Sequence, residues 1–158
     1  PPRWAGGTHP KYSPVFRYAQ YIIDGTNHWL TGYCDWNIVL DSIGGPNHVN
    51  NFAGAQVMID YANDIIYYTP YYYVLKQFSR SMRPGDVALQ VDYPATMKTG
   101  ADCETQDIFL CAVEKTDGSY AINILNMGPE TTLPVQLGNH YANVKLPAAS
   151  VQTIIVKL

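Results

Sequence analysis

The chain has 158 residues, of which 47% are hydrophobic and 15% are charged, and its net charge is −3. This composition is typical of a globular chain with a substantial core and excludes disorder, because disordered chains combine low hydrophobicity with high charge. No block of lysines and arginines is present, which excludes a basic nucleic-acid-binding surface. No apolar run approaches the roughly 20 residues of a membrane-spanning helix, so we expect no membrane span.

The first predicted element is a helix that begins at Ser13 and Pro14, because proline is favoured at the first position of a helix. Apolar residues then recur at the spacing of one helical face: Val15, Ala19, Ile22 and Ile23. Gly25 is the predicted end of this helix.

An apolar stretch at residues 29–40 follows, and we expect its second half, residues 32–39, to form a buried strand. Residues 41–51 form a loop rich in glycine, proline and asparagine. A polar loop directly after a buried strand is a common place for functional residues. A short extended piece is expected at residues 57–59.

A second helix is predicted to begin at Thr69-Pro70 and to end at Arg83-Pro84-Gly85. Beyond Arg83 the apolar period changes to two, which predicts strands. About five are expected, at residues 87–93, 107–114, 120–126, 132–137 and 151–158, with a hairpin turn at residues 116–119.

These elements predict two parts, residues 1–83 and residues 84–158. The strand–loop–helix order of the first part is typical of the end of an α/β barrel, which needs eight strands to close. The second part is predicted to be a β-sandwich, and such domains usually have about seven strands or more. Neither part has enough strands, so we expect sequence preceding Pro1 to complete both.

The most informative segment is GYCDWNIVLDSIGGPNHVNNF, at residues 32–52. At the carboxyl end of a barrel strand, where active sites of this fold lie, Trp36 would offer a flat wall for a sugar ring. Asn51 could hydrogen-bond hydroxyl groups, and Asp35 could orient neighbours or accept from a donor. The residues alone leave a structural alternative open, because such a tryptophan is often part of a core and Gly-Gly-Pro-Asn is a common turn.

The same run resembles the last barrel strand and following loop of glycoside hydrolase family 30, which includes glucosylceramidases and endo-β-1,6-glucanases. The resemblance continues from Asp60 through Tyr67, Tyr68 and Pro70 to Arg83-Pro84-Gly85. It covers residues 18–85 well and the later strands loosely. It implies a (β/α)8 barrel with a side β-sandwich built from both chain ends. It also implies retaining hydrolysis of β-linked sugars such as glucosylceramide or β-glucan.

The resemblance further implies substrate-binding roles. Trp36 corresponds to the tryptophan that lines the glucose-binding subsite, and Asn51 to a loop asparagine near it. His48 stands where the glucosylceramidases carry tryptophan, and this difference would suit a glycan leaving group over a lipid one. The complete set of candidate substrate-binding residues is Trp36, Asn51, Asp35, Asn37, Asn47, His48 and Phe52.

No catalytic residue is predicted within this chain. Retaining glycosidases use two carboxylates about 5–5.5 Å apart, and in the family both are glutamates on earlier barrel strands. The glutamates here are Glu104, Glu114 and Glu130, all in the predicted sandwich and none in a matching motif. We therefore expect the catalytic glutamates upstream of Pro1, and this chain alone to be inactive. Hydrolysis needs water and no cofactor, and the scattered histidines indicate no metal site.

Other interpretations remain at this stage. The chain could be a non-catalytic module derived from a glycosidase, with a structural or sugar-binding role, or a freestanding β-sandwich, which would leave residues 1–83 unexplained. The family resemblance implies a secreted or lysosomal-type location, although no signal peptide or N-x-S/T sequon is present. Cys103 and Cys111 could pair across a loop, which would leave Cys34 as a buried free thiol.

Overall fold

The computed structural model describes residues 13–50, 52–92 and 108–158. These residues form two helices and nine strands. In chain order the elements are α1 (Ser13–Asn27), β1 (Val39–Asp41), β2 (Val57–Asp60), β3 (Ile65–Tyr68), α2 (Pro70–Ser81), β4 (Val87–Leu89), β5 (Ile108–Glu114), β6 (Tyr120–Asn126), β7 (Thr131–Leu137), β8 (His140–Leu146) and β9 (Ser150–Val156).

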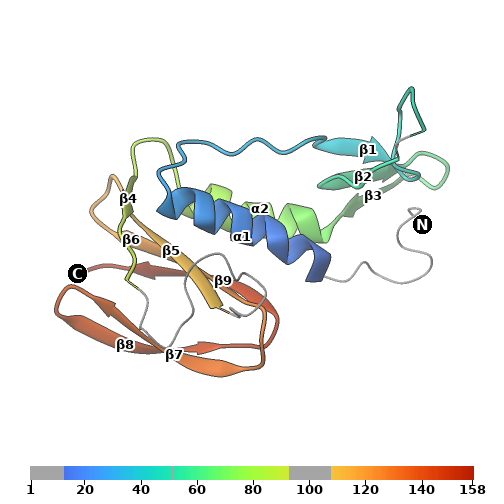
Figure 1. Ribbon diagram of the computed structural model, residues 1–158. Coiled ribbons are helices and arrows are strands. Elements are labelled where there is room, and N and C mark those ends of the chain that lie inside the picture. Colours follow the sequence, from blue (N-terminus) through green and yellow to red (C-terminus); the bar gives the residue numbers. More distant parts are fainter. Residues whose placement is uncertain (1–12, 51, 93–107) are drawn as a thin grey trace.

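The strands form three separate sheets. The first has the order β1-β2-β3, with β1 parallel and β3 antiparallel to β2. The second has the order β4-β5-β6-β9 and is antiparallel throughout, and the third is the β7–β8 hairpin. Figure 1 shows the two helices lying over the four-stranded sheet, the hairpin beneath that sheet, and the β1–β3 sheet at the far end of the helices. No closed barrel forms among the described residues.

The helices bury one face each against the four-stranded sheet. Val15, Ala19 and Ile23 of α1 are at most 1% exposed, and Val74 and Phe78 of α2 are 3% exposed. They pack with Phe109, Cys111 and Leu125 of β5 and β6 in one cluster. These residues recur at helical spacing and so form one apolar stripe on each helix, and each helix buries this stripe against the sheet.

The opposite face of the same sheet packs against the hairpin. Ile122 and Ile124 of β6 form a second cluster with Leu133 of β7 and Leu146 of β8. The strand β6 is therefore covered on both faces, which explains why six of its seven residues are buried.

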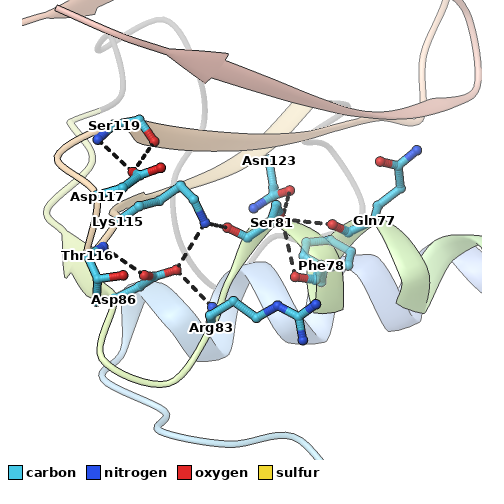
Figure 2. Close-up of polar contacts among 10 residues, drawn as sticks. All are labelled: Gln77, Phe78, Ser81, Arg83, Asp86, Lys115, Thr116, Asp117, Ser119 and Asn123. Carbon is cyan, nitrogen blue, oxygen red and sulfur yellow. Dashed lines mark hydrogen bonds and ion pairs between the residues drawn. The ribbon is translucent and has the colours of Figure 1, made fainter.

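A polar cluster, the junction cluster, joins the end of α2 to the sheet: Gln77, Ser81, Asp86, Lys115, Asn123 and Thr153. Asn123 is fully buried, and its Oδ1 accepts hydrogen bonds from Ser81 Oγ at 2.8 Å and Thr153 Oγ1 at 2.7 Å. Lys115 Nζ donates to the Ser81 carbonyl at 3.2 Å and lies 3.5 Å from Asp86 Oδ2 (Figure 2). The bonds of Asn123 and Thr153 tie α2 to β6 and β9, and those of Lys115 tie the end of α2 to the turn after β5.

Both helix starts, the extended piece at β2 and the 116–119 turn are where the sequence predicts them. The helix α1 continues past Gly25 to Asn27. The strands β3 and β8 were not expected. Most residues of β8 are exposed, so it lacks the alternation of buried residues that identifies strands.

The predicted buried strand at residues 32–39 is wrong. The strand β1 comprises only Val39–Asp41, which pairs with β2, and residues 30–38 lie in a long extended connection (Figure 1). An extended segment becomes a strand only when a neighbour pairs with its backbone, and no described segment lies in register with residues 32–38.

The predicted boundary at residues 83 and 84 coincides with the turn between α2 and β4. Asp86 organises this turn by accepting the Arg83 N–H at 2.8 Å. The core under the helices extends across the boundary, because α1 and α2 bury their apolar faces on β5 and β6. The division into two domains stays a prediction.

Candidate functional site

The extended connection between α1 and β1 carries three of the candidate residues. Trp36 is 85% exposed, so in the described residues it is a surface side chain and not part of a core. Asp35 and Asn37, on either side of it, are half-buried. Residues 31–34 and 38 of the connection are exposed as well, so Asp35 and Asn37 are the more buried positions of a largely exposed segment.

The loop after β1 is closed by Asp41. Its Oδ1 accepts the backbone N–H of Ile43 at 3.0 Å and of Gly45 at 2.7 Å. Gly44 has φ +90°, and a Cβ atom there would lie 2.4 Å from the Ala53 carbonyl oxygen. The two ends of the loop approach each other at this point, so Gly44 admits no side chain. The peptide bond between Gly45 and Pro46 is cis.

The tip of this loop carries the remaining candidates. Asn47 and His48 are exposed, and Asn47 Oδ1 accepts the N–H of Val49 at 3.2 Å. Phe52 is 38% exposed. Asn51 lies outside the described residues.

A residue that sequence analysis did not single out connects the extended connection to β2. Gln56 Nε2 donates to Asp35 Oδ2 at 2.5 Å, across 21 residues of sequence. Gln56 is 8% exposed, and its Oε1 is buried without a hydrogen-bond partner among the described residues. An unsatisfied buried acceptor costs about 1–3 kcal/mol. No local pattern identifies this contact, because the two residues meet only in the folded chain.

The charge of Asp35 also acts on Tyr33. Burial, followed by the negative charge of Asp35, raises the pKa of Tyr33 to about 12. Tyr33 is therefore a neutral phenol at physiological pH and can donate or accept hydrogen bonds.

The other carboxylates of this region serve local structure. Asp41 holds its loop, and Asp60 accepts from Asn63 Nδ2 at 2.8 Å and from two backbone N–H groups of the following turn. These hydrogen bonds, with Asn63 the largest contributor, lower the pKa of Asp60. Among the described residues Glu114 and Glu130 lie on β5 and before β7, far from this loop in sequence, and Glu130 forms a surface pair with Lys145. The described residues of this region offer an aromatic wall and hydrogen-bonding groups but no pair of free carboxylates.

The described residues contain no cluster of three metal-ligating side chains. Neither described helix is long and apolar enough to cross a membrane. Cys34 is exposed and Cys111 is buried, and both are free thiols. The expectation of a buried Cys34 was therefore wrong, because the connection that carries it is open to solvent, and Cys103 lies outside the described residues.

Large apolar side chains are unusually exposed on this side of the molecule. Single exposed residues of this kind need no explanation, but many in one region indicate a surface that contacts another molecule or segment. Those of the connection, the loop and the β1–β3 sheet that are more than half exposed are Trp29, Leu30, Trp36, Ile38, Ile43, Val49, Tyr61, Ile66 and Tyr68.

Comparison with known proteins identifies the class to which this arrangement belongs. Residues 8–82 match the model of the Glycosyl hydrolase family 30 TIM-barrel domain. The chain is 31% identical to Putative glucosylceramidase 1 of Caenorhabditis elegans over 95% of this chain and 29% of that protein. It is 32% identical to the Lysosomal acid glucosylceramidase of Mus musculus over 72% of this chain and 20% of that protein. The chain belongs to glycoside hydrolase family 30, as the sequence motif predicts.

Solved structures agree on the fold. SrfJ from Salmonella typhimurium superposes with a TM-score of 0.80 at 23% identity, over 93% of this chain and 31% of that chain. An endo-β-1,6-glucanase superposes with a TM-score of 0.68 at 25% identity, over 83% of this chain and 28% of that chain. The chain thus spans less than a third of the length of the relatives and structures that it matches here.

Proposed function

We propose that this chain forms the C-terminal part of a retaining β-glycosidase that hydrolyses β-glucosidic bonds. In this proposal it supplies substrate-binding side chains, and the two catalytic glutamates come from preceding barrel strands. The observation that carries the proposal is the 85% exposure of Trp36, at the end of the connection that leads into β1. A large aromatic side chain held in solvent next to a positioned carboxylate suits stacking on a sugar ring.

The remaining candidate residues surround this aromatic wall in the proposal. Asp35 and Asn37 flank it in sequence, and Asn47, His48, Asn51 and Phe52 belong to the loop that follows β1. The glycine-closed base of this loop, with Gly44 against Ala53, gives the loop a defined direction. A loop after a barrel strand is where enzymes of this fold bind substrate.

A preceding polypeptide segment is proposed to complete both the barrel and a β-sandwich. The exposed apolar side chains of the β1–β3 region support this partner, because burying them against further barrel elements is favourable by about 25 cal/mol per Å². The β7–β8 hairpin already packs on the four-stranded sheet through Leu133 and Leu146. In the proposal these two sheets are the C-terminal share of the sandwich.

The substrate is proposed to be a β-glucoside of the glucosylceramide or β-glucan type. The support is that the relatives bear the names of glucosylceramidases and one structural neighbour that of an endo-β-1,6-glucanase. His48 is exposed at the loop tip, and a small polar ring there suits a hydrophilic leaving group. A secreted or lysosomal-type location is proposed from the lysosomal relative.

The test compares two tryptophans of the same connection in the complete protein. Trp36→Ala is expected to lower kcat/KM for an aryl β-glucoside about 10- to 100-fold, or roughly 1.4–2.7 kcal/mol, while the melting temperature changes little. Trp29→Ala is the matched control, because Trp29 is 73% exposed but lies outside the proposed site. Unfolding of Trp36→Ala at ordinary temperature would assign Trp36 to a core instead.

A non-catalytic role in sugar binding or assembly is the second candidate. It is favoured by the exposed Trp36, because stacking on a sugar ring needs no catalytic carboxylate. Intact-mass measurement and peptide sequencing of the native protein separate the two candidates. Two glutamates on preceding barrel strands support the enzyme, and a complete protein without them supports the binding role.

A further inference from the structure

We propose that Gln56 is a positioning residue of the candidate sugar site: its side-chain amide holds the Asp35 carboxylate beside Trp36 so that Asp35 can accept a hydrogen bond from a sugar hydroxyl. This inference rests on the proposed function. It adds a residue to the site that neither the sequence motif nor the loop geometry indicates.

The contact itself is short and selective. Gln56 Nε2 lies 2.5 Å from Asp35 Oδ2, and no other hydrogen bond of a described residue reaches this carboxylate. One carboxylate oxygen is thereby occupied, and the other keeps its lone pairs available. Hydrogen bonds to an ionised acceptor are stronger than those between neutral groups, which makes a fixed carboxylate an effective partner for a hydroxyl.

The backbone of Gln56 is anchored from the start of α2. The Gln56 carbonyl oxygen accepts the Thr69 N–H at 3.0 Å and lies 3.2 Å from Thr69 Oγ1, which also donates to the Ala55 carbonyl at 2.8 Å. Thr69 is 2% exposed. The amide of Gln56 thus reaches Asp35 from a rigid base, whereas Asp35 lies on a connection that has no strand partner among the described residues.

The stability that this glutamine contributes is offset within its own side chain. Its Nε2 makes the bond to Asp35, whereas its Oε1 is buried without a partner among the described residues and carries a desolvation penalty of similar size. An apolar replacement of similar size loses both, so it is expected to change stability little and to impair the site by releasing Asp35.

The experiment uses the complete protein with an aryl β-glucoside as the probe. Gln56→Leu is expected to lower kcat/KM about tenfold with a melting temperature close to that of the wild type. Gln90→Leu is the matched control, because Gln90 Nε2 also donates to an aspartate, Asp92 at 3.2 Å, but on the exposed surface. A melting temperature that falls in Gln56→Leu in step with activity would overturn the positioning role.

Gln56→Glu supplies a readout that a purely structural role would not produce. Two ionised carboxylates at this distance repel each other, and they stay in contact only when they share a proton. The variant is expected to lose about tenfold in kcat/KM at pH 7 and to regain most of the loss as the pH is lowered towards 5. A pH–rate profile parallel to that of the wild type would contradict the proposed contact.

Failure of the proposed function is distinguishable from failure of this inference. A wild-type protein that hydrolyses no β-glucoside overturns the proposed function, and glucose binding, followed by calorimetry, then becomes the readout. Weaker glucose binding in Gln56→Leu than in Gln90→Leu keeps Gln56 as a positioning residue of a binding site. Equal binding in the two variants overturns it.

Discussion

The helix–sheet core and the β1–β3 region use similar side chains in opposite ways. Ile23 of α1 is fully buried on the four-stranded sheet, whereas Ile38 of the extended connection is 73% exposed. Polar groups give no such contrast, because Asn123 Nδ2 in the junction cluster and Gln56 Oε1 are both buried without a partner among the described residues. The apolar side chains of the first region pack against partners within the chain, and those of the second face outward, where a substrate or a further segment can meet them.

Removing apolar volume should separate the two regions most clearly. Ile23→Ala is expected to reduce the free energy of unfolding by about 2–5 kcal/mol, because it leaves a cavity in a packed core. Ile38→Ala should change it by less than about 0.5 kcal/mol. Chemical denaturation of the purified chain measures both.

The same pair sharpens the comparison in the complete protein. If a preceding segment covers the connection, Ile38→Ala should there cost well over 1 kcal/mol, because the side chain would be buried. An unchanged small effect in the complete protein would speak against such a cover.

The junction cluster provides the next largest effect. Asn123→Ala removes the acceptor shared by Ser81 and Thr153 and should cost about 1–3 kcal/mol. Asn143→Ala, at an exposed position of β8, is the control and should be nearly neutral. Equal effects in thermal denaturation would show that the cluster does not hold α2 on the sheet.

Acid should weaken the same junction through Asp86. Burial alone would raise the pKa of Asp86, but the N–H groups of Arg83 and Thr116 and the charge of Lys115 outweigh it, and the pKa is lowered. A carboxyl whose pKa is lowered by folding stabilises the fold fully at pH values above its pKa in the unfolded chain, which is about 4. This stabilisation is lost as the pH falls through its pKa in the folded chain. Denaturation midpoints measured from pH 6 to pH 2 should fall less steeply in Asp86→Asn. A slope identical to that of the wild type would assign the acid sensitivity to other groups.

The smallest expected effect is a difference in reactivity between the two described thiols. Burial raises the pKa of Cys111 to about 12, and the side chain is inaccessible on the face of β5 that the helices cover. Cys34 lies exposed on the connection. A maleimide should label Cys34 in the native protein and Cys111 only after unfolding, as peptide mass spectrometry would show. Native labelling of Cys111 would mean that the helices leave the sheet readily.

Elements with local signals were predictable from the sequence. Pro70 follows Thr69, which has an extended backbone (φ −85°, ψ 169°), at the start of α2. The hairpin between β5 and β6 closes through Asp117, whose Oδ1 accepts the Ser119 N–H at 3.0 Å, and through Gly118 at φ +77°. These features depend on neighbouring residues only, so a short window of sequence contains all the information they need.

The candidate site was predictable in part, because the motif from Asp35 to Phe52 indicates the family and the residues of interest. The exposure and the hydrogen bonds of those residues were not predictable. Residues 32–38 are apolar enough for a strand, yet most of them are exposed because no described segment pairs with them. The link between Gln56 and Asp35 was equally hidden.

By itself, the sequence determined both helices, the β5–β6 hairpin and the family, since these depend on residue order, helix-start signals and one long motif. Only the tertiary structure decided that the helices share one core with the sheet, that Trp36 faces solvent, and that Gln56 holds Asp35. The reason is physical: strand pairing, burial and hydrogen bonds between distant residues are properties of neighbours in space, and residue order alone does not specify which neighbours meet.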